Sequence, residues 1–161
     1  MWIEVAKRVH QELNGEVLFR LIGDGPRMES CKSIVNQLGL DDDFELLGFR
    51  DDVLSQLNSF DVFLMTSSVE GLPNVLIEAQ AMGVPVVTTD VGGASETFID
   101  GVTGHLVTTD DVEVLSEKII QILQSGEWKE QAKKKAIEYS REKFSVESMH
   151  QNLDNLLWGD N

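Results

Sequence analysis

The chain has 161 residues, a length that suits one domain with a hydrophobic core of its own. A content of 42% hydrophobic and 25% charged residues excludes a disordered chain, and the single cysteine, Cys31, excludes an intrachain disulfide framework. A formal net charge of −15 excludes binding to nucleic acid through a basic surface, and no apolar run reaches the roughly 18 residues of a membrane-spanning helix.

The spacing of apolar residues predicts helices that alternate with short strands. In chain order the predicted elements are helix 2–13, strand 17–22, helix 28–38, strand 44–49, helix 53–58, strand 61–65, helix 75–82, strand 84–88, helix 95–99, strand 105–107, helix 112–123, helix 128–139 and helix 146–158. Gly39 stands just past the second helix, where glycine is favoured, and Asp110 is expected to cap the helix that begins at Val112.

This alternation is typical of βαβ units and predicts an α/β fold, a Rossmann-like parallel sheet with helices on both faces. We expect residues 1–161 to form a single domain of this kind, with a helical extension at about residues 140–161. Ligands of such folds bind beyond the carboxyl ends of the strands. Three turns at that edge carry suitable residues, namely 23–26, 67–74 and 90–95.

The first of these turns resembles a dinucleotide-binding fingerprint only in part. Gly23 and Gly25 match its first two glycines, but Met28 replaces the third, and Pro26 removes an amide that could hold phosphate. Glu45 lies where a ribose-binding acid would, but acidic residues are common in this chain. The turn is therefore better read as a tight strand-to-helix connection, which disfavours a nicotinamide-dependent oxidoreductase.

The second turn leads from a buried strand into a helix that starts near Pro73. Proline suits the first helical turn, and the free amides of Leu72, Asn74 and Val75 are expected to form an anion site. Glu70 lies on the turn, and Glu78 projects one helical turn deeper. These carboxylates could accept hydrogen bonds from sugar hydroxyls while the amides hold phosphates. The alternative is that both are solvated charges, which a helix N-terminus also favours.

The pair Glu70 and Glu78 resembles the E-x7-E motif of retaining glycosyltransferases with the GT-B fold, in the large group called family 4 or group 1. The similarity covers roughly residues 2–125, in order, and corresponds to the C-terminal half that binds the donor nucleotide. The other segments that carry it are residues 23–26, 47–49, 61–64, 78–87, 92–93 with Glu96, 100–101 and 104–107.

The resemblance implies a role for each residue that matches the family's motifs. Glu78 would hold the ribose hydroxyls, and Glu70 would touch the donor sugar as the catalytic residue. The helix-start amides of Leu72, Asn74 and Val75 would hold the diphosphate and sugar. The other expected donor-binding residues are Gly23, Gly48, Phe49, Arg50, Ser67, Gly71 and Pro73, the last of which stands where the family often has glycine. The resemblance implies no metal and no cofactor, because the nucleoside-diphosphate sugar is the substrate.

This sequence departs from the family pattern at its start. The family's C-terminal half begins one strand earlier, and a basic pair on the following loop grips the diphosphate. Neither is found here, and the acceptor-binding N-terminal half is also absent from the sequence. A missing central strand would leave a gap between the strands at 17–22 and 61–65. We expect these two strands to pair directly in parallel, or a second copy of the chain to insert a segment between them.

Two functions remain open from the sequence. The first is a nucleotide-sugar-binding domain of a retaining, metal-independent glycosyltransferase that is inactive without its acceptor domain. The second is a non-catalytic or regulatory module that binds nucleotide sugars. The expected partners are the nucleotide-sugar donor and an N-terminal acceptor domain or a second chain, with no nucleic acid. Because the first residues lack a signal-peptide pattern and cysteine is rare, we expect a cytoplasmic protein.

Overall fold

The structure is a computed structural model that describes residues 1–108 and 110–158. Parallel strands alternate with helices along the chain, as the spacing of apolar residues predicts. The strands are β1 (Phe19–Ile22), β2 (Phe44–Gly48), β3 (Phe63–Met65), β4 (Val86–Thr89) and β5 (Gly104–Val107). The helices are α1 (Trp2–Glu12), α2 (Met28–Gln37), α3 (Val53–Leu57), α4 (Asn74–Ala81), α5 (Val112–Gln124), α6 (Gly126–Phe144) and α7 (Val146–Trp158), with short 3-10 turns at Asp41–Asp43 and Ala94–Glu96. The predicted α/β class is confirmed.

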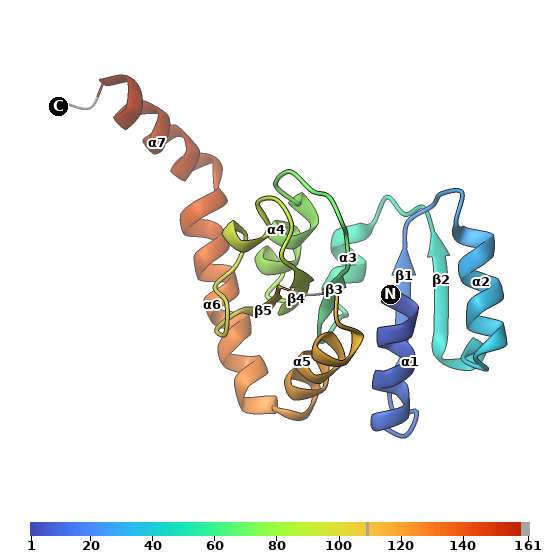
Figure 1. The fold of residues 1–161 in the computed structure, drawn as a ribbon. Coiled ribbons are helices and arrows are strands. Elements are labelled where there is room, and N and C mark those ends of the chain that lie inside the picture. Colours follow the sequence, from blue (N-terminus) through green and yellow to red (C-terminus); the bar gives the residue numbers. More distant parts are fainter. Residues whose placement is uncertain (109, 159–161) are drawn as a thin grey trace.

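The strands form two sheets (Figure 1). One has the order β1-β2 and the other β3-β4-β5, and every pairing within them is parallel. All four residues of β4 are buried, with Val86 in the core under α3 and α4 and Val87 in the core under α5. This alternation places helices on both faces of the three-stranded sheet.

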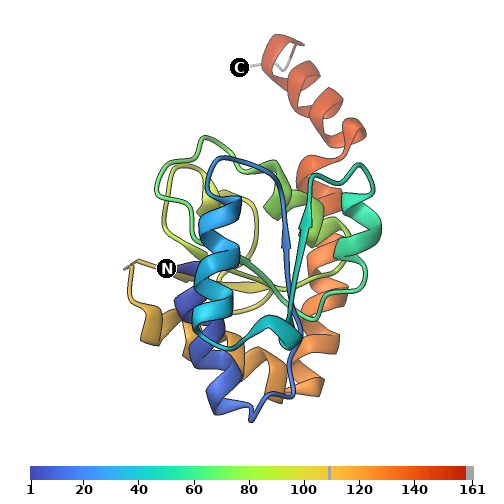
Figure 2. The ribbon, with the colours of Figure 1, turned by 90° about the vertical axis from the view of Figure 1, so that its right-hand side faces the viewer.

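Helix α1 joins the two sheets through its apolar stripe. Val5 and Val9 pack in the same cluster as α5, whereas Ile3 and Ala6 pack with α2 and β2 in another cluster. Figure 2 shows α1 and α2 together against the two-stranded sheet. α1 therefore packs across the boundary between the two sheets, although no hydrogen bonds join their strands among the described residues.

The expected direct pairing of the strands at 17–22 and 61–65 is wrong. β1 pairs only with β2 and β3 only with β4 among the described residues. The physical reason is the spacing set by α1 and α5, because both helices lie along the boundary and a shift of β1 toward β3 would break their shared core.

Three local expectations also differ from the structure. Asp111 rather than Asp110 caps α5, with its carboxylate accepting from the amides of Glu113 at 2.8 Å and Val114 at 3.4 Å. The helix expected at 95–99 is a 3-10 turn, Ala94–Glu96. Pro73 is the N-cap of α4 instead of a residue of its first turn. The first and third differences are shifts of one residue at a helix end, where neighbouring residues compete for the cap. The second shortens the expected helix to a single 3-10 turn.

The C-terminal helices lie against and beyond the three-stranded unit. α6 packs on α4, and α7 projects away from the body of the domain (Figure 1). No residue of α7 is buried. No described helix is long and apolar enough to cross a membrane.

Candidate functional site

The turn after β3 follows buried Met65 and ends at Pro73, the buried N-cap of α4. α4 has no side-chain cap, and its first amide that donates within the chain is that of Leu76, to the Pro73 carbonyl at 3.1 Å. The amides of Leu72, Asn74 and Val75 donate no hydrogen bond to any described residue. They are therefore free to bind an anion at the positive end of the helix dipole.

The two motif glutamates flank these amides. Glu70 is half-buried on the turn, and Glu78 is half-buried on α4. Neither carboxylate makes a hydrogen bond or an ion pair with any part of the chain that the structure describes. Along the chain, two carboxylates that accept hydrogen bonds thus precede and follow a set of free donors, which suits a ligand with both hydroxyl and anionic groups.

A glycine pair after β4 holds this turn in place. The amide of Gly93 donates to the carbonyl of Gly71 at 2.6 Å. Gly92 has φ +52°, and a Cβ there would lie 2.0 Å from the Glu70 carbonyl oxygen. In addition, the Thr89 hydroxyl donates to the Ser67 carbonyl at 2.8 Å. The end of β4 therefore fixes the backbone on which Glu70 sits.

The glycine pair is in turn tied to α6. The carbonyl of Glu96 accepts from the Tyr139 hydroxyl at 2.9 Å and from the Lys143 ammonium at 2.8 Å. Glu96 ends the 3-10 turn that follows Gly93. The sequence pointed to this segment through the turn at 90–95 and the pair at 92–93, but it gave Gly92, Gly93 and the α6 anchor no role in the site, since their contacts join segments far apart in the chain. The adjacent glycines after a strand were the available signal.

The remaining predicted residues form a second group at the end of the two-stranded sheet. The Gly23 amide donates to the Gly48 carbonyl at 2.8 Å, which brings the first turn and the end of β2 together. Phe49 is 79% exposed there. Arg50 makes two 2.7 Å hydrogen bonds to Asp52, which raise the pKa of Arg50 and lower the pKa of Asp52. Its guanidinium is therefore already partnered.

Among residues 1–108 and 110–158, no three His, Cys, Asp or Glu side chains gather where they could hold a metal ion. His105 lies on β5 and stacks on Trp128, with ring centroids 5.6 Å apart and planes 9° apart. Burial lowers the pKa of His105, nearby Lys118 lowers it further, and Asp100 opposes both. These surroundings indicate a packed residue of the β5–α6 contact.

This lowered pKa predicts a pH-dependent loss of stability. Below the ordinary value of 6.5, the unfolded chain takes up a proton that folded His105 resists, so stability falls as pH drops through that value. The urea midpoint of the native chain should fall between pH 7.5 and 5.5, and His105→Phe should reduce the fall while keeping the stack. His150→Phe, on exposed α7, is the control and should leave the fall unchanged. An equal fall in all three proteins would contradict this assignment.

Most of the chain matches a single family of known proteins. The model of the family described as glycosyl transferases group 1 matches residues 1–142. The Vi polysaccharide biosynthesis protein VipC/TviE of Salmonella typhi is 35% identical over 158 residues, which are 92% of this chain and 26% of that protein. The N-acetyl-alpha-D-glucosaminyl L-malate synthase of Bacillus anthracis is 31% identical over 147 residues, 91% of this chain and 38% of that protein. This chain thus spans well under half of either relative.

Solved structures give the same fold. A crystal structure of the Anabaena protein HepE in complex with UDP superposes with a TM-score of 0.84 at 25% identity and covers 95% of this chain and 44% of HepE. A crystal structure of TarM from S. aureus, in complex with fondaparinux, alpha-GlcNAc-glycerol and UDP, superposes with a TM-score of 0.87 at 28% identity. That match covers 98% of this chain and 32% of TarM. The similar region in each is one part of a longer GT-B chain.

Proposed function

Because this chain belongs to the group 1 glycosyltransferases, we propose that it binds the nucleoside-diphosphate-sugar donor of such an enzyme. The observation that carries the proposal is the start of α4, where three free amides lie between two carboxylates without partners among the described residues. A diphosphate needs donors, and ribose and sugar hydroxyls need acceptors. Both are supplied within a few residues of each other at the carboxyl end of a parallel strand, where ligands of this architecture bind.

Each group has a definite task in the proposed complex. The amides of Leu72, Asn74 and Val75 hold the diphosphate, so that no basic side chain is needed for it in this acidic chain. Glu78 accepts from the ribose hydroxyls, and Glu70 contacts the donor sugar. Ser67, Gly71 and Pro73 shape the turn around the phosphates and the sugar. Gly23, Gly48 and exposed Phe49 border the base, whereas Arg50 is held by Asp52.

The transfer we propose retains the configuration at the sugar and needs no divalent metal. Helix-start amides stabilise the negative charge that develops on the leaving diphosphate, and fixed contacts orient the sugar for attack. No nucleophile from the chain is required. The acceptor is bound by polypeptide outside these residues, since this chain spans only 26% and 38% of the two relatives. We therefore propose that residues 1–161 alone bind donor without transferring sugar.

The ribose contact gives a direct test. Glu78→Ala removes two charged hydrogen bonds and should weaken nucleoside-diphosphate binding by roughly 1.5–3 kcal/mol, or about 10- to 150-fold in Kd. Calorimetry with UDP, GDP and ADP measures this, and UDP is the first choice because HepE and TarM were both crystallised with it.

The matched control is Glu130→Ala, which removes an exposed glutamate from α6 that has no hydrogen-bond partner among the described residues. It should bind nucleotide like the native chain. Equal affinity of the native and Glu78→Ala proteins would remove Glu78 from the site. Failure of the native chain to bind any of the three nucleotides would overturn the proposed function as a whole.

A further inference from the structure

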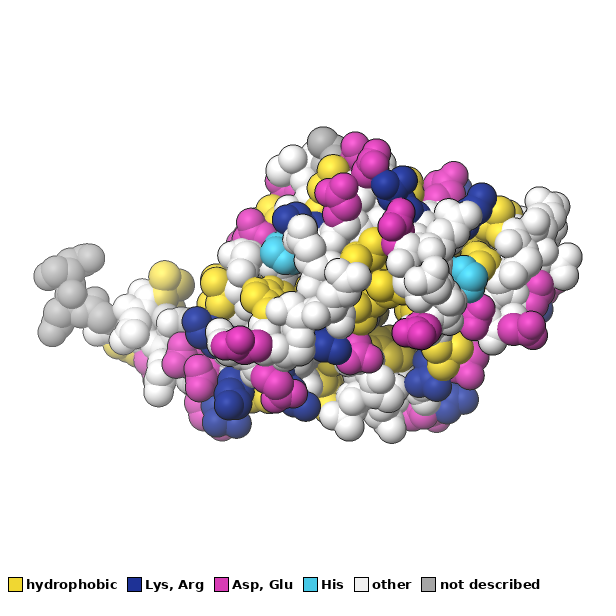
Figure 3. All heavy atoms as spheres, turned by 90° about the horizontal axis from the view of Figure 1, so that it is seen from below, with side chains coloured by type: hydrophobic (Ala, Val, Ile, Leu, Met, Phe, Trp, Pro, Cys, Tyr) yellow, Lys and Arg dark blue, Asp and Glu magenta, His cyan; other side chains and the backbone are white. Residues whose placement is uncertain are grey.

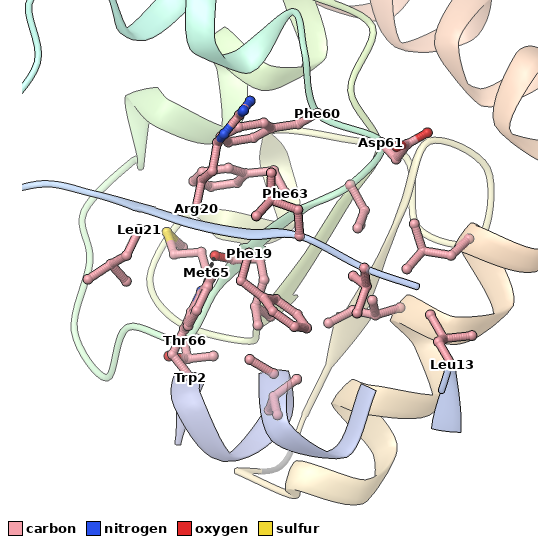
Figure 4. A pocket seen from close by; sticks show the side chains of 18 of the residues that line it. Trp2, Leu13, Phe19, Arg20, Leu21, Phe60, Asp61, Phe63, Met65 and Thr66 are labelled. Carbon is pink, nitrogen blue, oxygen red and sulfur yellow. Dashed lines mark hydrogen bonds between the residues drawn. The ribbon is translucent and has the colours of Figure 1, made fainter. Parts of the chain in front are cut away.

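The turn between β3 and α4 opens on a cavity on the side that faces β1. This cavity of about 980 Å³ lies between the two sheets, and Thr66 and Ser67 are in its wall (Figure 4). Hydrophobic side chains are visible in a hollow of the surface seen from below (Figure 3). Among the described residues, none that lines the cavity donates a hydrogen bond to the turn. The bonds that hold the turn come from the opposite side.

Two hydrogen bonds from the end of β4 hold the turn in place. The Thr89 hydroxyl donates to the Ser67 carbonyl at 2.8 Å, and the Gly93 amide donates to the Gly71 carbonyl at 2.6 Å. In the part of the chain that the structure describes, no other group outside the turn donates to residues 66–72. The position of the turn therefore depends on the segment that follows β4.

The segment after β4 is a compact unit with local hydrogen bonds. The Ala94 amide donates to the Val91 carbonyl, and the Glu96 amide donates to the Gly93 carbonyl, each at 3.1 Å. The hydroxyl of fully buried Thr97 donates to the Ala94 carbonyl at 2.7 Å. Because these bonds overlap along the segment, a displacement of Glu96 also displaces Gly93.

Helix α6 supplies two donors to this unit from a distant part of the chain. The Glu96 carbonyl accepts from the Tyr139 hydroxyl at 2.9 Å and from the Lys143 ammonium at 2.8 Å. Lys143 also donates to the Tyr139 oxygen at 3.0 Å, and its Nζ lies 5.4 Å from the ring centroids of Tyr139 and Phe144. Both acceptor positions of the carbonyl are thus filled by groups that orient one another.

The same helix is packed closely against the end of α4. Ala136 and Ser140 are buried on α6. A Cβ added at Gly83, just past α4, would lie 2.6 Å from Lys133 Cγ and 3.1 Å from Ile137 Cδ1. α6 therefore contacts α4 and, within about two helical turns, bonds to the segment after β4. It fixes that segment relative to the helix whose first turn forms the candidate donor site.

We propose that Tyr139 and Lys143 are positioning residues of the donor site. They act through the Glu96 carbonyl on the glycine pair, and the glycine pair acts on the turn that carries Glu70. The inference rests on the proposed function, because it takes the start of α4 as the site of the nucleoside diphosphate. Neither side chain needs to contact the ligand. Groups that bind a ligand must be held to well under an ångström, and a turn with two outside bonds obtains this precision from its support.

The test uses variants that separate the hydrogen bonds from the packing. Tyr139→Phe removes the hydroxyl and keeps the ring against Phe144, Lys143→Met removes the ammonium and keeps the apolar stem, and a double variant combines them. Lys143→Arg keeps a charged donor and is the conservative variant. The matched control is Lys135→Met, which removes one positive charge from an exposed α6 position without a hydrogen-bond partner among the described residues.

Amide hydrogen exchange of the nucleotide-free protein measures the contact between the glycine pair and the turn. The probe is the Gly93 amide, bonded to the Gly71 carbonyl, and the reference is the Gly101 amide, bonded to the Gly104 carbonyl at 2.8 Å. Each hydrogen bond lost at Glu96 corresponds to a factor of about five in an opening equilibrium. The double variant should therefore exchange about 10- to 30-fold faster at Gly93 and no faster at Gly101.

Calorimetry with UDP measures the effect on donor binding. The double variant should bind UDP about 3- to 10-fold more weakly, because only the fraction of the protein with a correctly placed turn binds. Lys143→Arg should bind within about twofold of the native chain, since it restores the charged donor, and Lys135→Met should match the native chain.

Three results would overturn the positioning role. They are unchanged exchange at Gly93, equal acceleration at Gly93 and Gly101, which indicates a general loss of stability, and faster exchange at Gly93 with unchanged UDP affinity. Failure of the native chain to bind UDP would instead overturn the proposed function. In that case exchange at Gly93 in the nucleotide-free protein still decides whether α6 positions the turn.

Discussion

Gly92→Ala should weaken binding of a nucleoside diphosphate by about 100-fold or more, because it displaces the backbone of Glu70 and Gly71, which leads directly into the Leu72 amide proposed to hold the diphosphate. The new Cβ would lie 2.0 Å from the Glu70 carbonyl oxygen and 2.7 Å from that of Gly71, both of which are backbone atoms that cannot rotate away. The turn must therefore move. The φ of +52° adds the strain of a left-handed residue. Calorimetry with UDP measures the loss of affinity, and urea unfolding measures any loss in the free energy of unfolding.

Two other glycines separate the clash from the strain. Gly101 has φ +73° but no atom within 4 Å of an added Cβ, so Gly101→Ala should cost about 1 kcal/mol of stability and leave nucleotide affinity unchanged. Gly93 has φ −89°, and its Cβ would lie 3.1 Å from the Gly71 carbonyl oxygen, so Gly93→Ala should have an intermediate effect on binding. If Gly92→Ala and Gly101→Ala bind nucleotide equally well, the turn does not depend on this contact.

Gln80→Glu should destabilise the fold by at least about 3 kcal/mol, since it places a carboxyl group in a fully buried position. The Gln80 side-chain amide donates to the carbonyls of Val84 at 3.1 Å and Thr103 at 3.2 Å, which joins α4, the segment before β4 and the turn before β5. An ionised carboxylate would repel both carbonyls and donate to neither. Chemical unfolding at pH 7 measures the change, which is a large part of the stability of an ordinary domain.

Gln80→Met is the matched variant, because it has a similar shape without charge. It loses the same two hydrogen bonds but also removes Oε1, which has no partner in the part of the chain that the structure describes. Its cost should be about 1–3 kcal/mol, the penalty for leaving buried carbonyls unpaired. Equal destabilisation by the two substitutions would show that the hydrogen bonds matter and the buried charge does not.

The order of helices and strands was predictable from the sequence because burial repeats with the period of each element. The stripe of Val5, Ala6 and Val9 is buried in α1, and the β-branched run at 84–88 overlaps β4 (Val86–Thr89), which is buried along its whole length. The spacing of Glu70 and Glu78 placed one carboxylate on the turn and one on α4, as the structure does. Local periodicity also fixes which turns follow strands, and hence the edge at which a ligand binds.

Helix ends were less predictable, because adjacent residues can serve equally well. Asp110 and Asp111 are both suitable caps, and only the backbone path before α5 selects the second. The end of α2 was easier to predict, because Gly39 follows it at φ +66°. This conformation lets the Leu40 amide donate to the Val35 carbonyl, and Leu40 is buried there.

Tertiary structure alone decided how distant segments meet. That Gly92 abuts Glu70, and that Tyr139 and Lys143 anchor the 3-10 turn after the glycine pair, depends on contacts across 22 to 47 residues of chain. The same holds for the separation of β1 from β3: both strands are apolar enough to pair, but the shared core of α1 and α5 sets their spacing. Hydrophobic patterning specifies which face of each element is buried, and only the packing of whole helices specifies what it is buried against.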